Sequence, residues 1–172
     1  VGRETNTEDT TLPTDSHHPV DFVAIESADF VNIIALTPRD ELILVEQYRH
    51  ATGAVTLEIP GGLVDAGEGV VEAGLRELRE ETGYTATSAR VLGVCRPNHA
   101  IMTNHLTTLL ATNVELSTPQ ALDEHEDCVV HAIPFVEVMA MVDDGRIDHA
   151  LVLAALTFEL RRRATSGSKL IA

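Results

Sequence analysis

Three glutamates, Glu77, Glu80 and Glu81, crowd into the stretch EGVVEAGLRELREETGY, which runs from Glu68 to Tyr84 and has a helical pattern. At about 100° per residue all three fall on one side of a helix, where side chains three or four positions apart are about 5–6 Å apart at Cβ. Carboxylates this close repel each other unless a cation lies between them. Their oxygens suit Mg²⁺ or Mn²⁺, so the spacing indicates a metal site, and the alternative is a solvated acidic face.

Two further features of the same segment favour the metal site. The chain already carries a large excess of negative charge, so further crowding needs a reason, and the turn PGGLVDAGE directly precedes the helix. An apolar stripe on the helix is expected to face a core, and Gly83 suits the left-handed position after the last turn. The stripe consists of Val71, Leu75 and Leu78, and a third side carries Glu72, Arg76 and Arg79.

Gly62, five further residues, Glu68, seven further residues and then RELREETGY at positions 76–84 together resemble the complete signature of the Nudix hydrolases. The order of strands and helices is also similar over most of residues 20–163. The resemblance implies an α/β fold in which a mixed β-sheet is sandwiched between helices. It also implies hydrolysis of a nucleoside diphosphate linked to another group.

The resemblance assigns metal-binding roles within the signature. It implies that Glu77 and Glu81 are ligands of Mg²⁺, with Mn²⁺ as an alternative, and that the backbone carbonyl of Gly61 is a further ligand. Glu80 is implied to be either a ligand or a catalytic group beside the metal. Bound metal ions would polarise the bridging phosphates and activate water.

Other signature positions are implied to be structural. Arg76 is expected to pair with an acid, with Glu68 as the favoured partner, and this pair would brace the loop against the helix. Gly62 and Gly83 complete this structural set.

The segment before the signature, LVEQYRHATGAVTLEIPGG, resembles the ADP-ribose and nucleotide-sugar pyrophosphatases. The resemblance implies that Arg49 and Glu58 contact substrate, and the alternative is an ordinary strand end. Downstream, Pro97 is present, but Asn98 replaces the glycine of that subgroup and Asn104 stands where an acid is expected. The departure points to a wider set of nucleoside diphosphate sugars, with Asn98 either a substrate-binding residue or a plain turn residue.

The acidic loop LDEHED at 122–127 is the third element of the predicted site. By position, the resemblance assigns Glu124 as the catalytic base and Glu126 as a further metal ligand. Asp123 and Asp127 compete for these roles, and a solvated acidic loop is the alternative. A base on a loop would suit a site that closes over its substrate.

These features predict metal-dependent hydrolysis of the pyrophosphate in ADP-ribose or a related nucleoside diphosphate sugar, giving a nucleoside monophosphate and a sugar phosphate. GDP-mannose or another nucleotide sugar is an alternative substrate, and a nucleoside triphosphate is disfavoured by Pro97 and the EQYR context. A non-catalytic Nudix ligand-sensing module is a rival, although the signature glutamates are all present.

Short apolar runs predict strands on both sides of the acidic helix, with TPRDE at 37–41 as a turn between two of them. Two helices follow, and Asp148 is the expected N-cap of the second, with Arg161 to Arg163 near its end. The predicted strands are VDFVAIES (20–27), FVNIIAL (30–36), LILVEQYR (42–49), VTLEI (55–59), SARVLGVCR (88–96), HLTTLLATNVE (105–115) and CVVHAI (128–133), and the two later helices are FVEVMAMVDDG (135–145) and DHALVLAALTFELRRR (148–163).

The 172 residues suit one domain, expected at 20–165, with a flexible arm at 1–19 and a tail at 166–172. A formal charge of −15 argues against nonspecific binding to nucleic acid or an anionic membrane. No apolar stretch approaches the ~20 residues of a membrane span, so a cytoplasmic protein is expected. Cys95 and Cys128 are expected to be buried, reduced thiols. The resemblance further implies a homodimer to which the N-terminal strands contribute.

Overall fold

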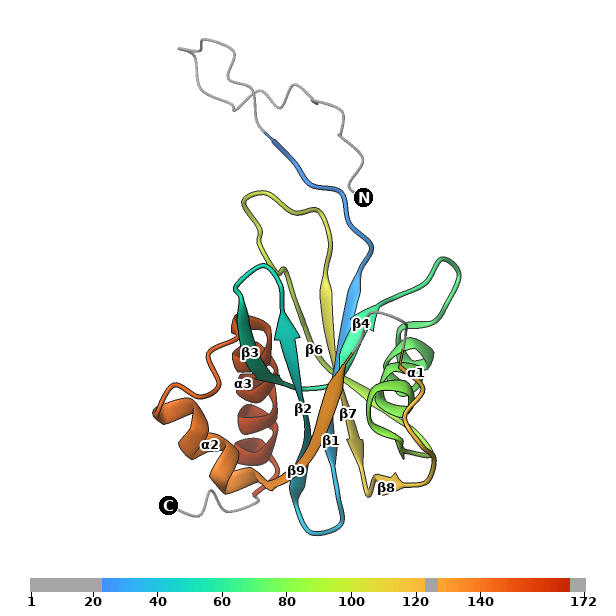
Figure 1. The fold of residues 1–172 in the computed structure, drawn as a ribbon, viewed down its shortest axis with the longest axis vertical. Helices are drawn as coiled ribbons and strands as arrows, with labels where there is room; N and C mark the ends of the chain where they lie inside the picture. Colours follow the sequence, from blue (N-terminus) through green and yellow to red (C-terminus); the bar gives the residue numbers. More distant parts are fainter. Residues whose placement is uncertain (1–22, 123–126, 168–172) are drawn as a thin grey trace.

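A mixed β-sheet runs through the molecule, with α1 (Val70–Thr82) on one side and α2 (Phe135–Asp143) and α3 (Ala150–Thr165) on the other (Figure 1). The computed structural model describes residues 23–122 and 127–167. These three layers confirm the predicted α/β fold. The strands are β1 (Phe30–Leu36), β2 (Glu41–Arg49), β3 (Ala54–Glu58), β4 (Gly61–Leu63), β5 (Tyr84–Thr85), β6 (Arg90–Cys95), β7 (Leu106–Thr112), β8 (Glu115–Leu116) and β9 (Cys128–Pro134).

Strands β1 and β2 are joined by a short turn and then separate. Only Leu36 and Leu42 are paired in register between them. Beyond that pair, β1 lies parallel to β7 and antiparallel to β4, whereas β2 lies antiparallel to both β3 and β9. The sheet therefore forks, and the two branches diverge in Figure 1 toward the end where β1 begins.

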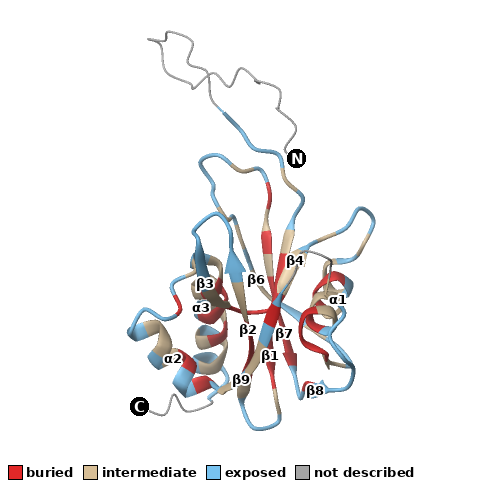
Figure 2. Ribbon diagram, viewed as in Figure 1, coloured by how far each residue is buried: buried red, intermediate tan, exposed pale blue. Residues whose placement is uncertain are grey.

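Both faces of the sheet are covered, which explains why β1 and β2 read as nearly continuous apolar runs. Alternate residues of a strand point to opposite faces. Val31 and Ile33 belong to a core cluster with Leu78 of α1, whereas Ile34 belongs to a second cluster with Leu156 of α3. Figure 2 shows the buried segments along the central strands and on the inner sides of the helices. The two clusters fix α1 and α3 against the sheet.

Helix α1 ends as predicted, with Gly83 in the left-handed conformation at φ 73°. Its buried side differs slightly from the predicted stripe. Leu78 is fully buried, but Val71 and Leu75 are only partly buried, and Glu81 is buried instead. A Cβ at Gly74 would overlap Leu109 of β7, so glycine permits this close approach of helix and sheet. The resulting orientation carries Glu81 toward the sheet.

Two predicted element boundaries are wrong. In the described part of 20–27, no strand forms, because the segment makes only one bridge, Ile25 to Met102, and its side chains are mostly exposed. Helix α3 begins one residue later than expected. His149 is its N-cap, and no side chain caps the helix, so Asp148 does not have the predicted role.

The structure bears on three further predictions, which concern the cysteines, a membrane span and the N-terminal arm. The cysteines are free thiols, but only Cys128 is buried and Cys95 is half-buried. Within 23–122 and 127–167, no helix is long and apolar enough to cross a bilayer. The predicted arm at 1–19 lies outside the described residues.

Candidate active site

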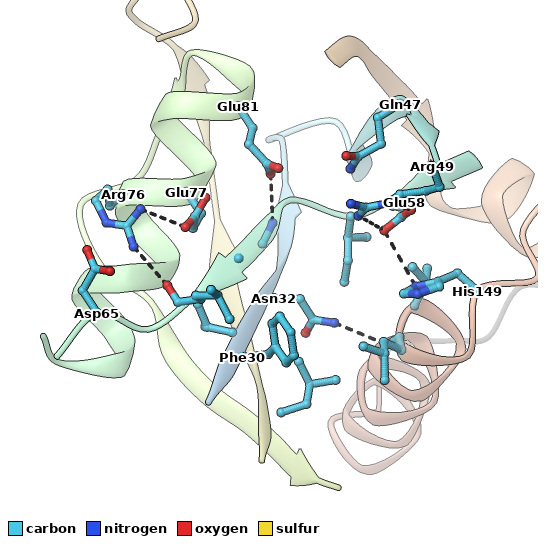
Figure 3. A pocket seen from close by; sticks show the side chains of 18 residues that line it. Phe30, Asn32, Gln47, Arg49, Glu58, Asp65, Arg76, Glu77, Glu81 and His149 are labelled. Atoms are coloured by element: carbon cyan, nitrogen blue, oxygen red, sulfur yellow. Dashed lines mark hydrogen bonds and ion pairs between the residues drawn. The ribbon is translucent and has the colours of Figure 1, made fainter. Parts of the chain in front are cut away.

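A cavity of about 590 Å³ lies between the two branches of the sheet. Its walls come from β1 to β4, the start of β7, helix α1 and the first turn of α3 (Figure 3). Its volume falls within the range of roughly 300–1,000 Å³ that is usual for small-molecule sites. Charged side chains gather at two ends of this cavity, one on α1 and one beside α3.

The α1 end holds two of the predicted metal ligands. Glu81 is buried, with 4% of its surface exposed, and its Oε2 accepts a hydrogen bond from the Gly61 N–H at 2.9 Å. Glu77 Oε1 accepts a hydrogen bond from Arg76 Nη1 at 2.8 Å. The Glu77 carboxylate lies so close to Gly62 that any Cβ at Gly62 would overlap it. The glycine turn and both carboxylates therefore meet at one place.

Arg76 is the centre of the hydrogen bonds at this end. Its Nε and Nη2 donate to the two carboxylate oxygens of Glu68 at 2.9 and 3.0 Å, so the predicted Arg76–Glu68 pair is present. The same guanidinium donates to Glu77 and to Glu80, at 3.2 Å for Glu80. Its hydrogen bond to Glu68, together with those to Glu77 and Glu80, raises the pKa of Arg76, and in return Arg76 lowers the pKa of Glu68. Arg76 and Glu68 are therefore both charged at neutral pH.

Glu80 occupies a different position from Glu77 and Glu81. Its carboxylate lies between Arg76 and Arg79, whose Nη2 donates to it at 3.0 Å. Among the residues that the structure describes, the cavity walls include Glu77 and Glu81 but not Glu80. Glu80 therefore contacts the cavity only through Arg76 in this structure.

The opposite end of the cavity contains the two predicted substrate contacts, Arg49 and Glu58. They bind each other through a two-pronged ion pair, with N–O distances of 2.8 and 2.7 Å. Thr56 Oγ1 also donates to Glu58, at 2.7 Å. Burial alone would raise the pKa of Glu58, but the hydrogen bonds from Arg49 and Thr56 outweigh it and keep this pKa below its ordinary value. His149 lies beside the pair, with Nδ1 3.8 Å from Glu58 Oε2.

The downstream asparagines lie in the loop between β6 and β7. Asn98 is exposed, and its backbone carbonyl accepts hydrogen bonds from the N–H groups of Ile101 and Met102, as a turn residue does. It does not line the cavity among the described residues. Asn104 is buried, and its Nδ2 donates to the Ala28 carbonyl at 3.1 Å.

The predicted base Glu124 and the predicted ligand Glu126 lie outside the described residues, as does Asp123. Asp127 is described and is exposed just before β9. The structure therefore leaves these roles as predictions from the sequence.

Several cavity residues were not predicted from the sequence, among them Phe30, Asn32, Asp65 and His149. The sequence could have indicated Asn32, because it is a polar residue within the apolar run FVNIIAL. The others come from separate elements, and no local spacing connects them. Their proximity follows only from the fork between β1 and β2.

The donor atoms at the α1 end suit a hard divalent cation. Glu77 and Glu81 supply carboxylate oxygens beside the backbone of Gly61, and oxygen donors are those that Mg²⁺ and Mn²⁺ prefer. No group of three or more His, Cys, Asp or Glu side chains is gathered for a metal within 23–122 and 127–167. This is compatible with Mg²⁺, which commonly binds through one or two carboxylates together with substrate phosphates.

Comparison with known proteins places these features in context. The NUDIX domain model matches residues 27–156. An ADP-ribose pyrophosphatase of Mycobacterium tuberculosis is 31% identical over 134 residues, which are 77% of this chain and 65% of that protein. An ADP-ribose pyrophosphatase of Saccharomyces cerevisiae is 39% identical over 83 residues, which are 47% of this chain and 35% of that protein. The chain thus spans less than two thirds of the length of these relatives.

A solved structure titled as an ADP compounds hydrolase is also similar. It superposes with a TM-score of 0.74 at 26% sequence identity, over 82% of this chain and 75% of the other. The similarity therefore extends through most of both folds.

Proposed function

The chain belongs to the NUDIX domain family, and from that premise we propose that it hydrolyses the pyrophosphate bond of ADP-ribose or a related nucleoside diphosphate sugar. The products would be a nucleoside monophosphate and a sugar phosphate. The observation that carries the proposal is the placement of Glu77 and Glu81 with Gly61 at one end of a cavity large enough for a nucleotide sugar.

The proposed reaction needs a divalent cation, and Mg²⁺ is the proposed ion, with Mn²⁺ as the alternative. Glu77, Glu81 and the Gly61 carbonyl are the proposed ligands from the described residues. When bound, the cation would offset the charge of the pyrophosphate and polarise its phosphorus–oxygen bonds. The acidic end of the cavity would otherwise repel an anionic substrate, so this neutralisation is required for binding as well as for catalysis.

The chain's own residues orient the proposed ligands. Arg76 holds the Glu77 carboxylate by a hydrogen bond and ties it to Glu68 on the preceding loop. The Gly61 N–H holds Glu81 in the same way. Such contacts fix the direction in which each carboxylate points and reduce the reorganisation needed when metal and substrate bind. Glu80, bound to Arg76 and Arg79, is proposed to assist from outside the cavity wall.

Two further roles rest on the family resemblance. Glu124 is proposed as the catalytic base and Glu126 as an additional metal ligand. The test is the pair Glu124→Gln and Glu126→Gln: loss of kcat in the first, with Mg²⁺ binding kept, supports the assignment. Loss of kcat in Glu126→Gln alone would exchange the two roles.

Substrate choice is proposed to depend on the Arg49 end of the cavity. The Arg49–Glu58 pair would contact the part of the substrate beyond the pyrophosphate, since it lies across the cavity from Glu77. The names of the similar enzymes make ADP-ribose the leading candidate. Asn98 remains a candidate contact only if the β6–β7 loop moves toward the substrate, because it lies off the cavity wall in this structure.

The deciding experiment is a product assay on purified protein with Mg²⁺. The panel contains ADP-ribose, GDP-mannose, ADP-glucose, UDP-glucose and a deoxynucleoside triphosphate, ranked by kcat/KM. A clear preference for ADP-ribose supports the proposal, and a ranking led by GDP-mannose would change the substrate but keep the chemistry. Turnover of none of them, with metal present, would refute hydrolysis of nucleotide sugars.

A homodimer is proposed as the assembled form. Three apolar side chains, Val23, Ile25 and Ile101, are exposed where the N-terminal segment crosses the β6–β7 loop. Burial of this small patch against a second copy would remove apolar surface from water. Light scattering coupled to gel filtration tests it, and a monomeric mass would refute it.

A further inference from the structure

The cavity contains a second group of polar atoms that the metal-binding end does not use. They lie on β1 and at the start of α3, one in the middle of the cavity wall and the other beside the Arg49–Glu58 pair (Figure 3). Asn32 of β1 and His149 at the start of α3 are the two residues concerned. Neither one belongs to the signature segment.

Asn32 is buried, with 6% of its surface exposed, and lines the cavity. Its Nδ2 donates to the Leu151 carbonyl at 3.3 Å, which fixes the direction of the amide. Its Oδ1 is also buried, and no group in the described part of the chain donates to it. A buried polar atom without a partner is unfavourable, so a hydrogen-bond acceptor left in this state on a cavity wall points to a ligand.

His149 presents a similar atom. Its Nδ1 is buried and makes no hydrogen bond within the described residues, since Glu58 Oε2, at 3.8 Å, is beyond hydrogen-bond distance. Glu58 is already occupied by Arg49 and Thr56. The cavity wall therefore offers one fixed acceptor, Asn32 Oδ1, and one imidazole nitrogen that donates or accepts according to its tautomer.

The surroundings restrict what these atoms bind. The charges beside His149, on Arg49 and Glu58, offset each other, so an additional charged group gains little there. Phe30 and Leu106 provide apolar wall beside Asn32. Asn32 is also paired with Gly61 in the β1–β4 ladder, so its side chain lies next to the proposed phosphate end.

From this geometry we propose that Asn32 and His149 form a subsite for the vicinal hydroxyls of a ribose ring in the substrate. A hydroxyl both donates and accepts, so one hydroxyl donates to Asn32 Oδ1 and its neighbour pairs with His149 Nδ1. The apolar face of the ring lies against Phe30. The subsite rests on the proposed function, and it adds a specificity for ribose over deoxyribose that the signature does not determine.

The test is binding of a non-hydrolysable α,β-methylene analogue of ADP-ribose, measured by calorimetry with Mg²⁺. Two further analogues lack a hydroxyl, one on the adenosine ribose and one on the terminal ribose. The protein is expected to bind one of the two about tenfold more weakly than the parent, as for loss of a hydrogen bond to a buried group. The analogue affected identifies which ribose occupies the subsite. Equal binding of all three, or no binding of any, overturns the proposal.

The variants assign the effect to the two residues. In Asn32→Leu, which keeps the approximate volume, the parent and the deoxygenated analogue are expected to bind with equal affinity. The control is Thr108→Val, because Thr108 is the in-register neighbour of Asn32 on β7 and also has a buried, unpartnered hydroxyl, but does not line the cavity among the described residues. This control is expected to keep the tenfold difference.

Two outcomes with the variants overturn the proposal. If Asn32→Leu keeps the difference, Asn32 Oδ1 binds only solvent, and if Thr108→Val also removes it, the effect is structural. His149→Phe repeats the test should Asn32→Leu fail to fold, and the difference must shrink there too. Because binding is measured without turnover, a protein that binds with this pattern but does not hydrolyse ADP-ribose would refute the proposed function and support the subsite.

Discussion

Helices α1 and α3 each carry a network of glutamates and arginines, and the two networks differ in the balance of their charges. On α1, Arg76 alone is shared by Glu68, Glu77 and Glu80, and Arg79 adds only one contact to Glu80. This network borders the cavity. More carboxylate than guanidinium is present, with Glu81 close by.

On α3, the network is balanced and closed. Glu159 is fully buried and accepts hydrogen bonds from Arg162 and Arg163, at 2.7 Å from each Nε. Arg163 also binds Asp40 in the turn between β1 and β2, at 2.8 Å, and its guanidinium lies over the Phe135 ring. Two arginines thus serve two acids, which fastens the end of α3 to the sheet.

The difference separates a functional site from a network that only stabilises the fold, although both consist of glutamates and arginines. A network with equal numbers of carboxylates and guanidinium groups needs no further ion and contributes to stability. In a network with excess carboxylates beside a cavity, the carboxylates repel each other, and a bound cation would reduce this repulsion. The comparison predicts that substitutions on α1 reduce activity more than stability, and that substitutions on α3 do the reverse.

The largest effect is expected for Glu81→Gln. Loss of one proposed ligand charge should lower kcat by about a thousandfold, the upper range for removing one charge-stabilising group from an active site. The fold should persist, since the amide still accepts from the Gly61 N–H. Product assays with Mg²⁺ and thermal unfolding by circular dichroism check both parts. Full activity in this variant and in Glu77→Gln would eliminate the metal-site assignment.

The converse is expected for Glu159→Gln. Removing a buried charge leaves Arg162 and Arg163 partly unpaired, and breaking such a network costs about 3–5 kcal/mol of unfolding free energy. The kcat/KM of the folded variant should be unchanged well below its melting temperature. Urea unfolding measures the loss. The control is Asp144→Asn, which breaks an exposed pair with Arg146 and should change stability far less. Equal losses of unfolding free energy in the two variants would contradict the stabilising role of the Glu159 network.

A smaller effect is expected for Arg76→Lys. A lysine cannot bind both oxygens of Glu68 and reach Glu77 at once, because it lacks the planar fork of arginine. Loss of a group that orients ligands typically costs about 10–100-fold in metal affinity or activity. The Mg²⁺ concentration for half-maximal activity should rise accordingly. Arg79→Lys is the matched control, since Arg79 makes one exposed contact to Glu80. A similar shift in both variants would mean that net charge, rather than geometry, is responsible.

The unbalanced network was largely predictable from the sequence because its members lie on one helix and the loop before it. Spacing along a helix determines which side chains are neighbours, and Gly83 marks the end of the helix by its backbone requirement. The order of strands and helices was also predictable from apolar runs. The short strands β4, β5 and β8 were not, since two or three residues carry no period.

The other half of the site was not predictable in this way. Asn32 and His149 are far apart in the chain, and they line the same cavity because β1 leaves β2 after a single pair at Leu36 and Leu42. No local pattern encodes that divergence. The N-cap of α3 was also misplaced: Asp148 has the better capping side chain, but His149 is the N-cap and no side chain caps the helix. The balanced network joining Glu159 to Asp40 likewise depends on tertiary contact.

The Arg49–Glu58 pair is the closest test of the difference between the α1 and α3 networks. It has one acid for one arginine, as on α3, but it lies in the cavity. Its pairing holds the pKa of Glu58 below the ordinary value of 4.5, despite burial. The ionised carboxylate therefore stabilises the fold above pH 4.5, and this contribution is lost as the pH falls through the lower pKa of the folded state.

The predicted consequence is a small, pH-dependent difference between the protein and Glu58→Gln. The variant should be less stable at neutral pH, and the difference in unfolding free energy should shrink in acid. Urea unfolding at several pH values measures it, and kcat/KM at neutral pH measures the other role. A stability difference with unchanged kcat/KM would mean that the pair only stabilises the fold. Equal numbers of acids and arginines would then mark a stabilising network even inside a cavity. If kcat/KM also falls, the pair acts on the substrate, and equal charge would mark stabilising networks only away from the cavity.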